Sequence, residues 1–480
     1  MASGARRLHD GDGDLVDRIH TLARWPAGLD PTAIPDAAKS RAALIVADDI
    51  GAMAAGTVVG EVAALHRLVS TRPGEPEAHL AGTDLPPLRR EEAAFANAVA
   101  ANWCELDEGY RPIACHAGLY TVPAVLAEAE ATGASAALVL EAVIVGYETA
   151  THLARCFAGP ELIVHPHAGL SAIAATAALA HMRGLSADDR VAAMGAAATL
   201  SAPGPWSHAM GGLQIRNAWA GHGATTAFRT LTAVEAGMAG DAAGVVEVLS
   251  DVMGARDRQS VDPAALVDDL GTHWAVTDGY HKIYACCQYA HAGIHAALEI
   301  RAGMTDDDWL AEIEAIEVAT HPLALMLADA EPATDLAARF SLPHAIAVAL
   351  LTGRADAASF AADRVSNPLI ARLRRLVRLS EFQPLPAPPM DRPARVTVVL
   401  CGNRRLSAQC DSAPGSPDCP LNRDAVLAKT RAAIDGRNPA LVAWTAALAT
   451  LEPDTLTARV PPLASPANYP TSHPALRPAG

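Results

Sequence analysis

A long succession of alanine-rich apolar segments, with no strand pattern between them, most strongly limits the folds open to this chain. From about residue 14 to residue 254, apolar residues recur at helical spacing, and short breaks with Gly, Pro or Ser separate the segments. Alanine has the highest helix propensity and a small side chain, so such segments favour closely packed helices. We predict an all-helical domain of the bundle type. Its expected helices are residues 37–55, 122–130, 134–157, 168–183, 187–200 and 218–237.

The pattern changes after about residue 262. Residues 313–320 (IEAIEVAT) and 394–400 (ARVTVVL) alternate and are rich in β-branched side chains, which is typical of strands. Helical patterns lie between them at 290–302 and 342–351, and return at 423–435 and 439–451 after a Pro/Gly-rich loop at 413–420.

A chain of 480 residues exceeds the size at which a single core stops growing, so we expect more than one domain. The predicted fold class is mainly α, with a large helical domain and a smaller, lid-like α+β domain. The helical domain is discontinuous, because the C-terminal helices are expected to return to it. The predicted boundaries are 1–265 for the helical domain, 266–405 for the α+β domain, 406–465 for the returning helices and 466–480 for a loose tail.

Composition and charge exclude several classes of partner. The net charge of −16 argues against binding to nucleic acid or to an anionic membrane. No stretch approaches the ~20 apolar residues that span a bilayer, since the most apolar run, 168–180, is short. Polar residues follow the two N-terminal arginines, so we expect no signal peptide and a cytoplasmic location. Charged residues make up only 19%, which suggests that subunits bury part of the surface.

No metal or cofactor is expected. The chain has no CxxC pair, and the evenly spaced Cys401, Cys410 and Cys419 match no common metal pattern. The DGDGD run that begins at Asp10 lacks the glycine and the distal glutamate of a calcium loop. Ser-x-x-Lys, G-x-S-x-G, Walker A, Rossmann and H-E-x-x-H patterns are also missing, which removes most nucleotide-binding and hydrolase functions.

Two polar segments of the helical region contain groups suited to acid–base chemistry. ELDEGYRPIACH (105–116) combines three carboxylates with an arginine and a histidine, and its glycine and proline indicate a loop that presents polar groups. VHPHAG (164–169) places His165 before a predicted helix, whose N-terminus favours a bound anion. The structural alternatives are a solvated acidic turn and a pair of capping or surface histidines.

Two further segments offer cations. In GGLQIRN (211–217), Arg216 supplies a planar guanidinium suited to a carboxylate, although a lone arginine is usually a surface residue. HKIYACCQYAH (281–291) lies at the predicted domain junction, where ligand clefts tend to form. Lys282 in such a cleft could bind a carboxylate or act as a proton donor. Its adjacent cysteines are better explained as small packing residues than as a redox pair.

At these places the sequence resembles the MmgE/PrpD family, which includes 2-methylcitrate dehydratase, cis-aconitate decarboxylase and iminodisuccinate epimerase. The family's acidic LDxDDxH loop is similar to ELDEGYRPIACH, its FHPT segment to VHPHAGLSAIAATAALA, and its (K/R)xxxxG segment to IRNAWAG. KxYPCCRYTHxxIDAALEL is similar to KIYACCQYAHAGIHAALEI, FSxPYAxAxAL to FSLPHAIAVAL, and GxPxxPL to GSPDCPL. The order of the six motifs is specific for the family but not for one reaction.

The resemblance implies a metal-independent homodimer with a cleft between its two domains. The cleft is expected to collect Asp107, His116, His165, Arg216, Lys282 and His344. Arg111, Tyr284, Cys287, Gln288 and His291, from the same motifs, complete the predicted substrate-binding set.

The sequence departs from the family pattern inside these motifs. Gln288 stands where arginine is common, and His344 where tyrosine is common. Glu108 replaces an aspartate, Tyr110 a frequent histidine, and Ala117 a proline. The loss of an arginine and the gain of a histidine suggest a substrate whose carboxylates are arranged differently from those of methylcitrate.

The predicted reaction forms negative charge on a carbon beside a carboxylate. Arg216 and Lys282 are expected to bind carboxylates, and His116 and His165 to move protons, one as base and one as acid. Asp107 is expected to orient a neighbouring histidine. The leading prediction is dehydration of a small hydroxy-polycarboxylate. The alternatives, in order, are epimerisation of a dicarboxylate such as iminodisuccinate, cis-aconitate-type decarboxylation, and a catalytically inactive carboxylate-binding protein.

Overall fold

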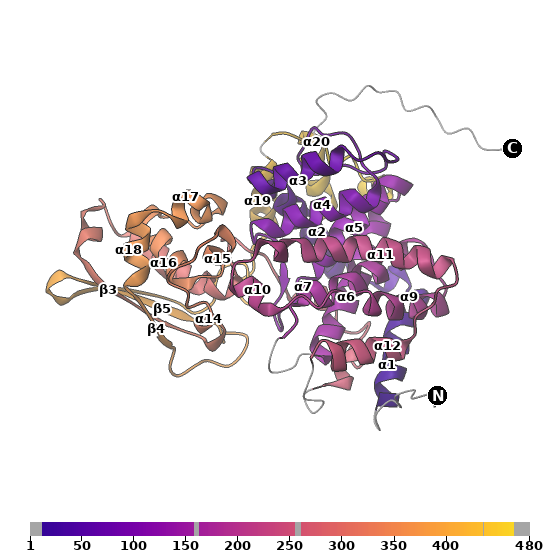
Figure 1. Cartoon of the computed structure of the whole chain (residues 1–480), viewed down its shortest axis with the longest axis horizontal. Helices are drawn as coiled ribbons and strands as arrows, with labels where there is room; N and C mark the ends of the chain where they lie inside the picture. Colours follow the sequence, from indigo (N-terminus) through magenta and orange to yellow (C-terminus); the bar gives the residue numbers. More distant parts are fainter. Residues whose placement is uncertain (1–11, 158–162, 255–260, 435, 465–480) are drawn as a thin grey trace, which may run out of the picture.

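The chain forms two lobes, a larger helical lobe and a smaller lobe that contains a sheet (Figure 1). The computed structural model describes residues 12–157, 163–254, 261–434 and 436–464. The predicted fold class, mainly helical with a smaller α+β part, is confirmed. The predicted loose tail lies outside the described residues, and the predicted domain boundaries stay predictions.

Buried alanine-rich helices build the larger lobe. α5 is buried from Ala117 to Ala129, which makes it a central helix, and the neighbouring α6 and α8 are buried along most of their length. Each of the six predicted helices is present with small shifts at its ends, except that 168–183 is divided at Leu170 into α7 and α8. The elements are α1 (Asp12–Arg24), α2 (Asp36–Gly56), α3 (Gly60–Ser70), α4 (Arg90–Trp103), α5 (Ala117–Thr132), α6 (Ala136–Cys156), α7 (Pro166–Gly169), α8 (Ser171–Met182), α9 (Ala187–Thr199), α10 (Trp206–Met210), α11 (Trp219–Glu235) and α12 (Ala242–Val246).

One helix corrects the expectation that no apolar stretch reaches membrane-spanning length. α6 has 21 residues, and by length and composition it passes the test for a span, as does the sharply bent pair of α2 and α3. However, 83% of the apolar window of α6 is buried inside the protein. The neighbouring helices therefore cover α6 as they cover the core helix of a globular protein.

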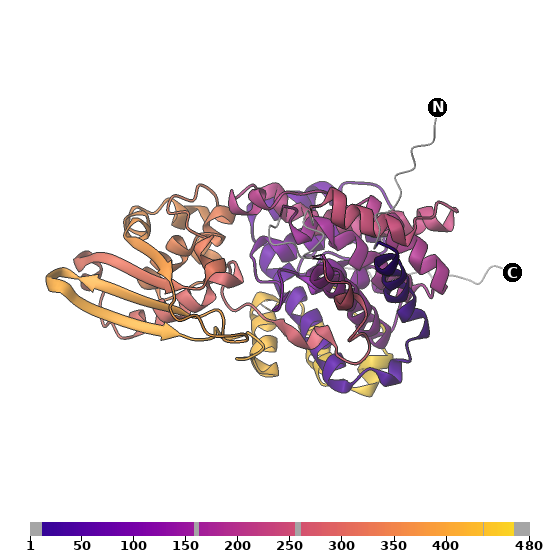
Figure 2. The same cartoon turned by 90° about the horizontal axis from the view of Figure 1, so that it is seen from below.

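The smaller lobe is a four-stranded sheet with helices against it (Figure 2). Its strand order is β4-β3-β5-β6, with β3 parallel to β4 and antiparallel to β5. β3 and β5 have the predicted bounds, whereas β4 and β6 are additional strands. The elements are α13 (His291–Ala302), β3 (Ile313–Thr320), α14 (Pro322–Leu325), α15 (Asp335–Arg339), α16 (Leu342–Thr352), α17 (Ala362–Val365), α18 (Pro368–Arg375), β4 (Val377–Glu381), β5 (Ala394–Leu400) and β6 (Arg404–Cys410).

The last helices of the chain pack on the first lobe. α19 (Arg423–Ile434) lies against α2, and the hydroxyl of Thr430 donates to the carbonyl of Ala47 at 2.9 Å. Gly51 permits this close approach, because a Cβ there would lie 3.0 Å from the backbone of Thr430. From the same helix, Lys429 Nζ donates to the carbonyl of Leu106 at 2.6 Å. α20 (Pro439–Ala449) and α21 (Pro453–Thr457) complete the lobe.

Candidate active site

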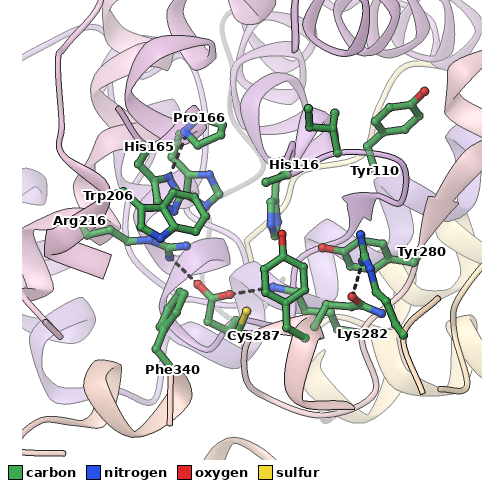
Figure 3. A pocket seen from close by; sticks show the side chains of 17 residues that line it. Tyr110, His116, His165, Pro166, Trp206, Arg216, Tyr280, Lys282, Cys287 and Phe340 are labelled. Carbon is green, nitrogen blue, oxygen red and sulfur yellow. Dashed lines mark hydrogen bonds and ion pairs between the residues drawn. The ribbon is translucent and has the colours of Figure 1, made fainter. Parts of the chain in front are cut away.

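A cavity of about 470 Å³, including the space at its mouth, lies where the two lobes meet (Figure 3). Segments far apart in the sequence contribute its wall, namely the 105–116 loop, the turn before α7, α10, the segment after β2, and the segment before β5. Most of the side chains are polar or aromatic. They are Glu105, Tyr110, Ile113, Ala114, His116, His165, Pro166, His167, Trp206, Arg216, Tyr280, Lys282, Cys287, Gln288, Tyr289, Phe340 and Arg392.

A two-residue ladder joins the acidic loop to the segment that contains Lys282. β1 (Gly109–Tyr110) pairs antiparallel with β2 (Gly279–Tyr280), so the residues after β2 lie beside the loop. Gly109 is required here, because a Cβ would lie 2.2 Å from the hydroxyl of Tyr280. The ladder therefore holds Tyr280 at the cavity wall only if residue 109 has no side chain.

His116 and Asp107 form a hydrogen-bonded pair at the centre of the cavity. His116 Nδ1 lies 2.6 Å from Asp107 Oδ2, and Asp107 is fully buried. Burial opposes ionisation of Asp107, but the charge of Lys282 and the hydrogen bond with His116 outweigh it and lower the pKa of Asp107 below the usual value. An ionised Asp107 accepts a hydrogen bond from the Nδ1–H of His116, which leaves Nε2 of His116 as a proton acceptor. The His116 side chain is 15% exposed.

Glu105 links two buried cations. It forms an ion pair with Arg216 through one oxygen and accepts from Lys282 Nζ at 2.8 Å through the other. Burial opposes its ionisation, but the charges of Arg216 and Lys282 lower the pKa of Glu105 to about 2. Lys282 also lies 3.4 Å from Asp107 Oδ1, and the two carboxylates raise its pKa despite complete burial. Lys282 therefore stays charged at neutral pH.

Two neutral histidines lie together in the cavity wall: Figure 3 shows His165 beside Arg216, and the His167 ring lies 4.4 Å from that of His165. Burial, reinforced by the charge of Arg216, lowers the pKa of both His165 and His167 well below the usual value. His165 Nδ1 accepts the backbone N–H of His167 at 3.2 Å, so its proton lies on Nε2. Trp206 stacks on the His165 ring at 4.5 Å and excludes water from one face.

Glu108, which departs from the family pattern, points away from the cavity. It accepts the Gly118 N–H at 2.6 Å and the Tyr147 hydroxyl at 3.1 Å, within the helical lobe. Burial, together with the nearby charge of Asp107, raises the pKa of Glu108 to about 8. Burial and the neighbouring Glu108 also raise the pKa of Asp49 well above the usual value. The substitution therefore changes the support of the loop and not the cavity wall.

The structure brings seven of the eleven predicted site residues together. Six line the cavity, and Asp107 lies directly behind His116. The six are His116, His165, Arg216, Lys282, Cys287 and Gln288.

Four predicted residues lie away from this cavity. Arg111 pairs with Asp391 at 2.6 Å. Tyr284 and His291 make an edge-to-face ring contact, with centroids 5.1 Å apart, inside the smaller lobe. His344 lies beside Phe360, with Nε2 3.4 Å from the carbonyl of Ser359. We therefore assign none of these four side chains to substrate.

Several cavity residues escaped the sequence reasoning. Glu105 and His167 belong to motifs that were recognised, but a motif alone does not say which side chains face inward. Trp206, Tyr280 and Arg392 lie outside those motifs and reach the cavity only through tertiary packing. The one available signal for Arg392 was its place two residues before the predicted strand 394–400.

Three side chains have the spacing of a metal site. One ligand atom from each of Asp107, His116 and His167 lies within 4.8 Å of the others. The positive charges of Lys282 and Arg216 oppose a divalent cation there, and one of them already pairs with Asp107 at 3.4 Å. We therefore propose no metal at this cluster.

The helical lobe and the smaller α+β lobe enclose a histidine–aspartate pair beside buried cations, an arrangement that can transfer a proton next to an anion. Residues 20–254 match the MmgE/PrpD N-terminal domain, and residues 284–444 match the MmgE/PrpD C-terminal domain. The chain belongs to the MmgE/PrpD family, whose members are typically dehydratases or decarboxylases. No curated protein matches the chain.

Proposed function

We propose that the chain is a metal-independent lyase that dehydrates a small hydroxy-polycarboxylate, or hydrates the corresponding alkene. The observation that carries the proposal is the His116–Asp107 pair, which faces a cavity where Lys282 and Arg216 are fixed as cations. Such an arrangement suits removal of a proton from a carbon beside a carboxylate, because base and positive charge lie together.

His116 is the proposed base. Asp107 holds the imidazole through Nδ1, so Nε2 is free to take the proton from carbon. General base catalysis of this kind contributes about 10²- to 10⁴-fold to the rate. Asp107 acts through His116, and its own contact with Lys282 keeps it ionised.

The cations stabilise the charge that develops on the substrate. Lys282 and Arg216 are buried beside the proposed base, where a positive charge acts more strongly than in water. The raised pKa of Lys282 makes it an electrostatic group and a poor proton donor. His165 has its proton on Nε2 and donates a hydrogen bond, so we assign it binding rather than the proton transfer expected from the sequence.

The protonation of the histidines favours elimination over epimerisation. Epimerisation needs a second acid that returns a proton to the opposite face of the carbanion. The pKa values of His165 and His167 lie well below the usual value, so neither holds a spare proton at neutral pH. In elimination, His116 takes the proton from carbon and gives it to the departing hydroxide, which leaves as water. Only one acid–base group is then required.

Proton NMR in heavy water tests the proposal. Citrate, 2-methylcitrate, aconitate, tartrate and iminodisuccinate would each be incubated with the protein. New alkene signals support dehydration, and loss of alkene signals from aconitate supports hydration. Deuterium that enters a substrate without loss of heavy atoms indicates epimerisation, and loss of CO₂ indicates decarboxylation. Binding without turnover or exchange contradicts an enzyme.

His116→Ala tests the assigned base. We expect at least about 100-fold slower turnover with an unchanged melting temperature. His222, exposed on α11, provides the matched control, since His222→Ala removes an imidazole that does not line the cavity. Equal activity of the two variants contradicts the assignment.

We also propose that the chain forms a cytoplasmic homodimer. The family resemblance and the low share of charged residues support the dimer. Light scattering on the purified protein tests it, and a monomer at micromolar concentration contradicts it.

A further inference from the structure

A third buried cation lines the cavity, separate from the pair held by Glu105. Arg392 lies in the segment just before β5 and is 8% exposed. Its Nη1 donates to Gln288 Oε1 at 2.6 Å, and its Nη2 donates to the carbonyl of Arg111 at 2.9 Å. The guanidinium also lies over the ring of Tyr289, 5.1 Å from its centroid. These contacts fix the plane of the guanidinium.

No carboxylate neutralises Arg392 within the described ranges. Its hydrogen-bond acceptors are an amide and a backbone carbonyl, and its buried Nε has no hydrogen-bond partner. The nearest acid along the chain, Asp391, pairs instead with Arg111 at 2.6 Å. Burial and the positive charge of Arg111 lower the pKa of Arg392 and outweigh the opposite effect of Asp391, which is bonded to Arg111 and not to Arg392. A buried unpaired charge is costly, so a ligand carboxylate is the natural partner.

The position of Arg392 is opposite to that of Arg216. Figure 3 shows Arg216 and Tyr280 on opposite sides of His116 and Lys282. Arg392 donates to the carbonyl of Arg111, the residue directly after β1, and β1 pairs with β2, which contains Tyr280, so Arg392 belongs to the Tyr280 side. The cavity therefore has one cation at each end, with the proposed base and Lys282 between them.

We propose that Arg392, held in place by Gln288, binds a second carboxylate of the substrate at the end of the cavity opposite Arg216. The inference rests on the proposed function and specifies its substrate as an acid with two separated carboxylates, one beside the reacting carbon and one distal. Gln288 occupies the position where the family commonly has arginine. Its amide oxygen binds a guanidinium from another segment, so the positive charge is present but displaced.

Isothermal titration with isosteric ligands tests the inference without any turnover. Succinate and glutarate would be compared with their monoamides, which differ from them by one charge. The wild-type protein is expected to bind at least one diacid about 10-fold or more tightly than its monoamide, because a charge-assisted hydrogen bond contributes about 1.5–3 kcal/mol. Arg392→Gln is expected to abolish this preference, and Arg392→Lys to retain part of it.

Arg395→Gln is the matched control. Arg395 lies on β5, three residues away, and is exposed with its guanidinium bonded to Gln409. We expect this variant to keep the wild-type preference. Gln288→Ala is expected to weaken diacid binding in the wild-type background but not in Arg392→Gln, since both changes act on one group. Melting temperatures verify that each variant is folded.

The outcomes separate this inference from the proposed function. A diacid preference that persists in folded Arg392→Gln overturns the role of Arg392, whatever the activity. Absence of any carboxylate binding to the wild-type protein overturns both. Loss of the preference in Arg392→Gln, with no turnover of any hydroxy acid, supports the subsite and contradicts the lyase.

Discussion

Glu108→Gln offers a test of the buried carboxyl that supports the acidic loop. Glu108 is fully buried, and its pKa of about 8 means that the folded protein keeps it protonated at neutral pH. Glutamine has the shape of the protonated acid. Its oxygen accepts the Gly118 N–H, and its NH₂ donates to the Tyr147 hydroxyl, so both contacts survive.

The sign of the pH effect follows from linkage. Between the ordinary pKa of 4.5 and the folded value of about 8, the folded state holds a proton that the unfolded state has lost. The free energy of unfolding therefore decreases as pH rises through this window. At 1.36 kcal/mol per pKa unit, the decrease is at most about 5 kcal/mol. Unfolding entropy of about 2.1 cal/mol/K per residue converts this into about 5 °C of melting temperature for a chain of this length.

Circular dichroism melts at about pH 5.5 and about pH 8.5 measure the effect. We expect the wild-type melting temperature to fall over this interval and that of Glu108→Gln to fall less, so the variant is the more stable protein at high pH. Glu61→Gln, at an exposed position of α3, is the control and should behave as wild type. The reasoning is refuted if wild type and Glu108→Gln lose the same amount of stability between the two pH values.

One substitution, at Gly109, and one chemical modification, of Cys287, test the cavity wall further. Gly109→Ala should slow turnover at least about 10-fold, because the new Cβ displaces the Tyr280 hydroxyl from its position 2.2 Å away, a positional error of the kind that costs up to 10²-fold. Gly60→Ala, where a Cβ meets nothing within 4 Å, should leave kcat unchanged, and equal rates for the two variants would exclude the steric argument. Burial, with the charge of Glu105, raises the pKa of Cys287 from 9.0 to about 11, so alkylation at pH 7.5 should be about 100-fold slower than for an ordinary thiol. Mass spectrometry that finds Cys287 modified as fast as the exposed cysteines would contradict this.

The sequence predicts the parts of the fold whose pattern is set by burial on one face. β3 and β5 are the central strands of the sheet, and their alternating β-branched residues gave both bounds correctly. β4 and β6 are the edge strands, and their exposed positions contain arginine, serine and glutamate. Their pairing comes from the neighbouring strand rather than from their own composition, so the apolar pattern did not reveal them.

The candidate site was predictable where function is local and not where it depends on packing. His116 and Asp107 are nine residues apart on one loop, so their contact follows from the motif. His344 looked equivalent to them in the sequence, but its ring lies beside Phe360 inside the smaller lobe. The approach of Arg392 to Gln288 joins residues 104 positions apart, and no single-sequence pattern encodes such a distance.

The contact between Lys429 and the acidic loop has a consequence for protein synthesis. Lys429 donates to the carbonyl of Leu106 and pairs with Asp48 at 2.7 Å, so the loop acquires its last support from a helix near the C-terminus. During synthesis, the ribosome completes the acidic loop long before α19 emerges. The cavity therefore forms only after translation is nearly finished, and an mRNA truncated before the codons for α19 would yield a polypeptide without a completed acid–base centre.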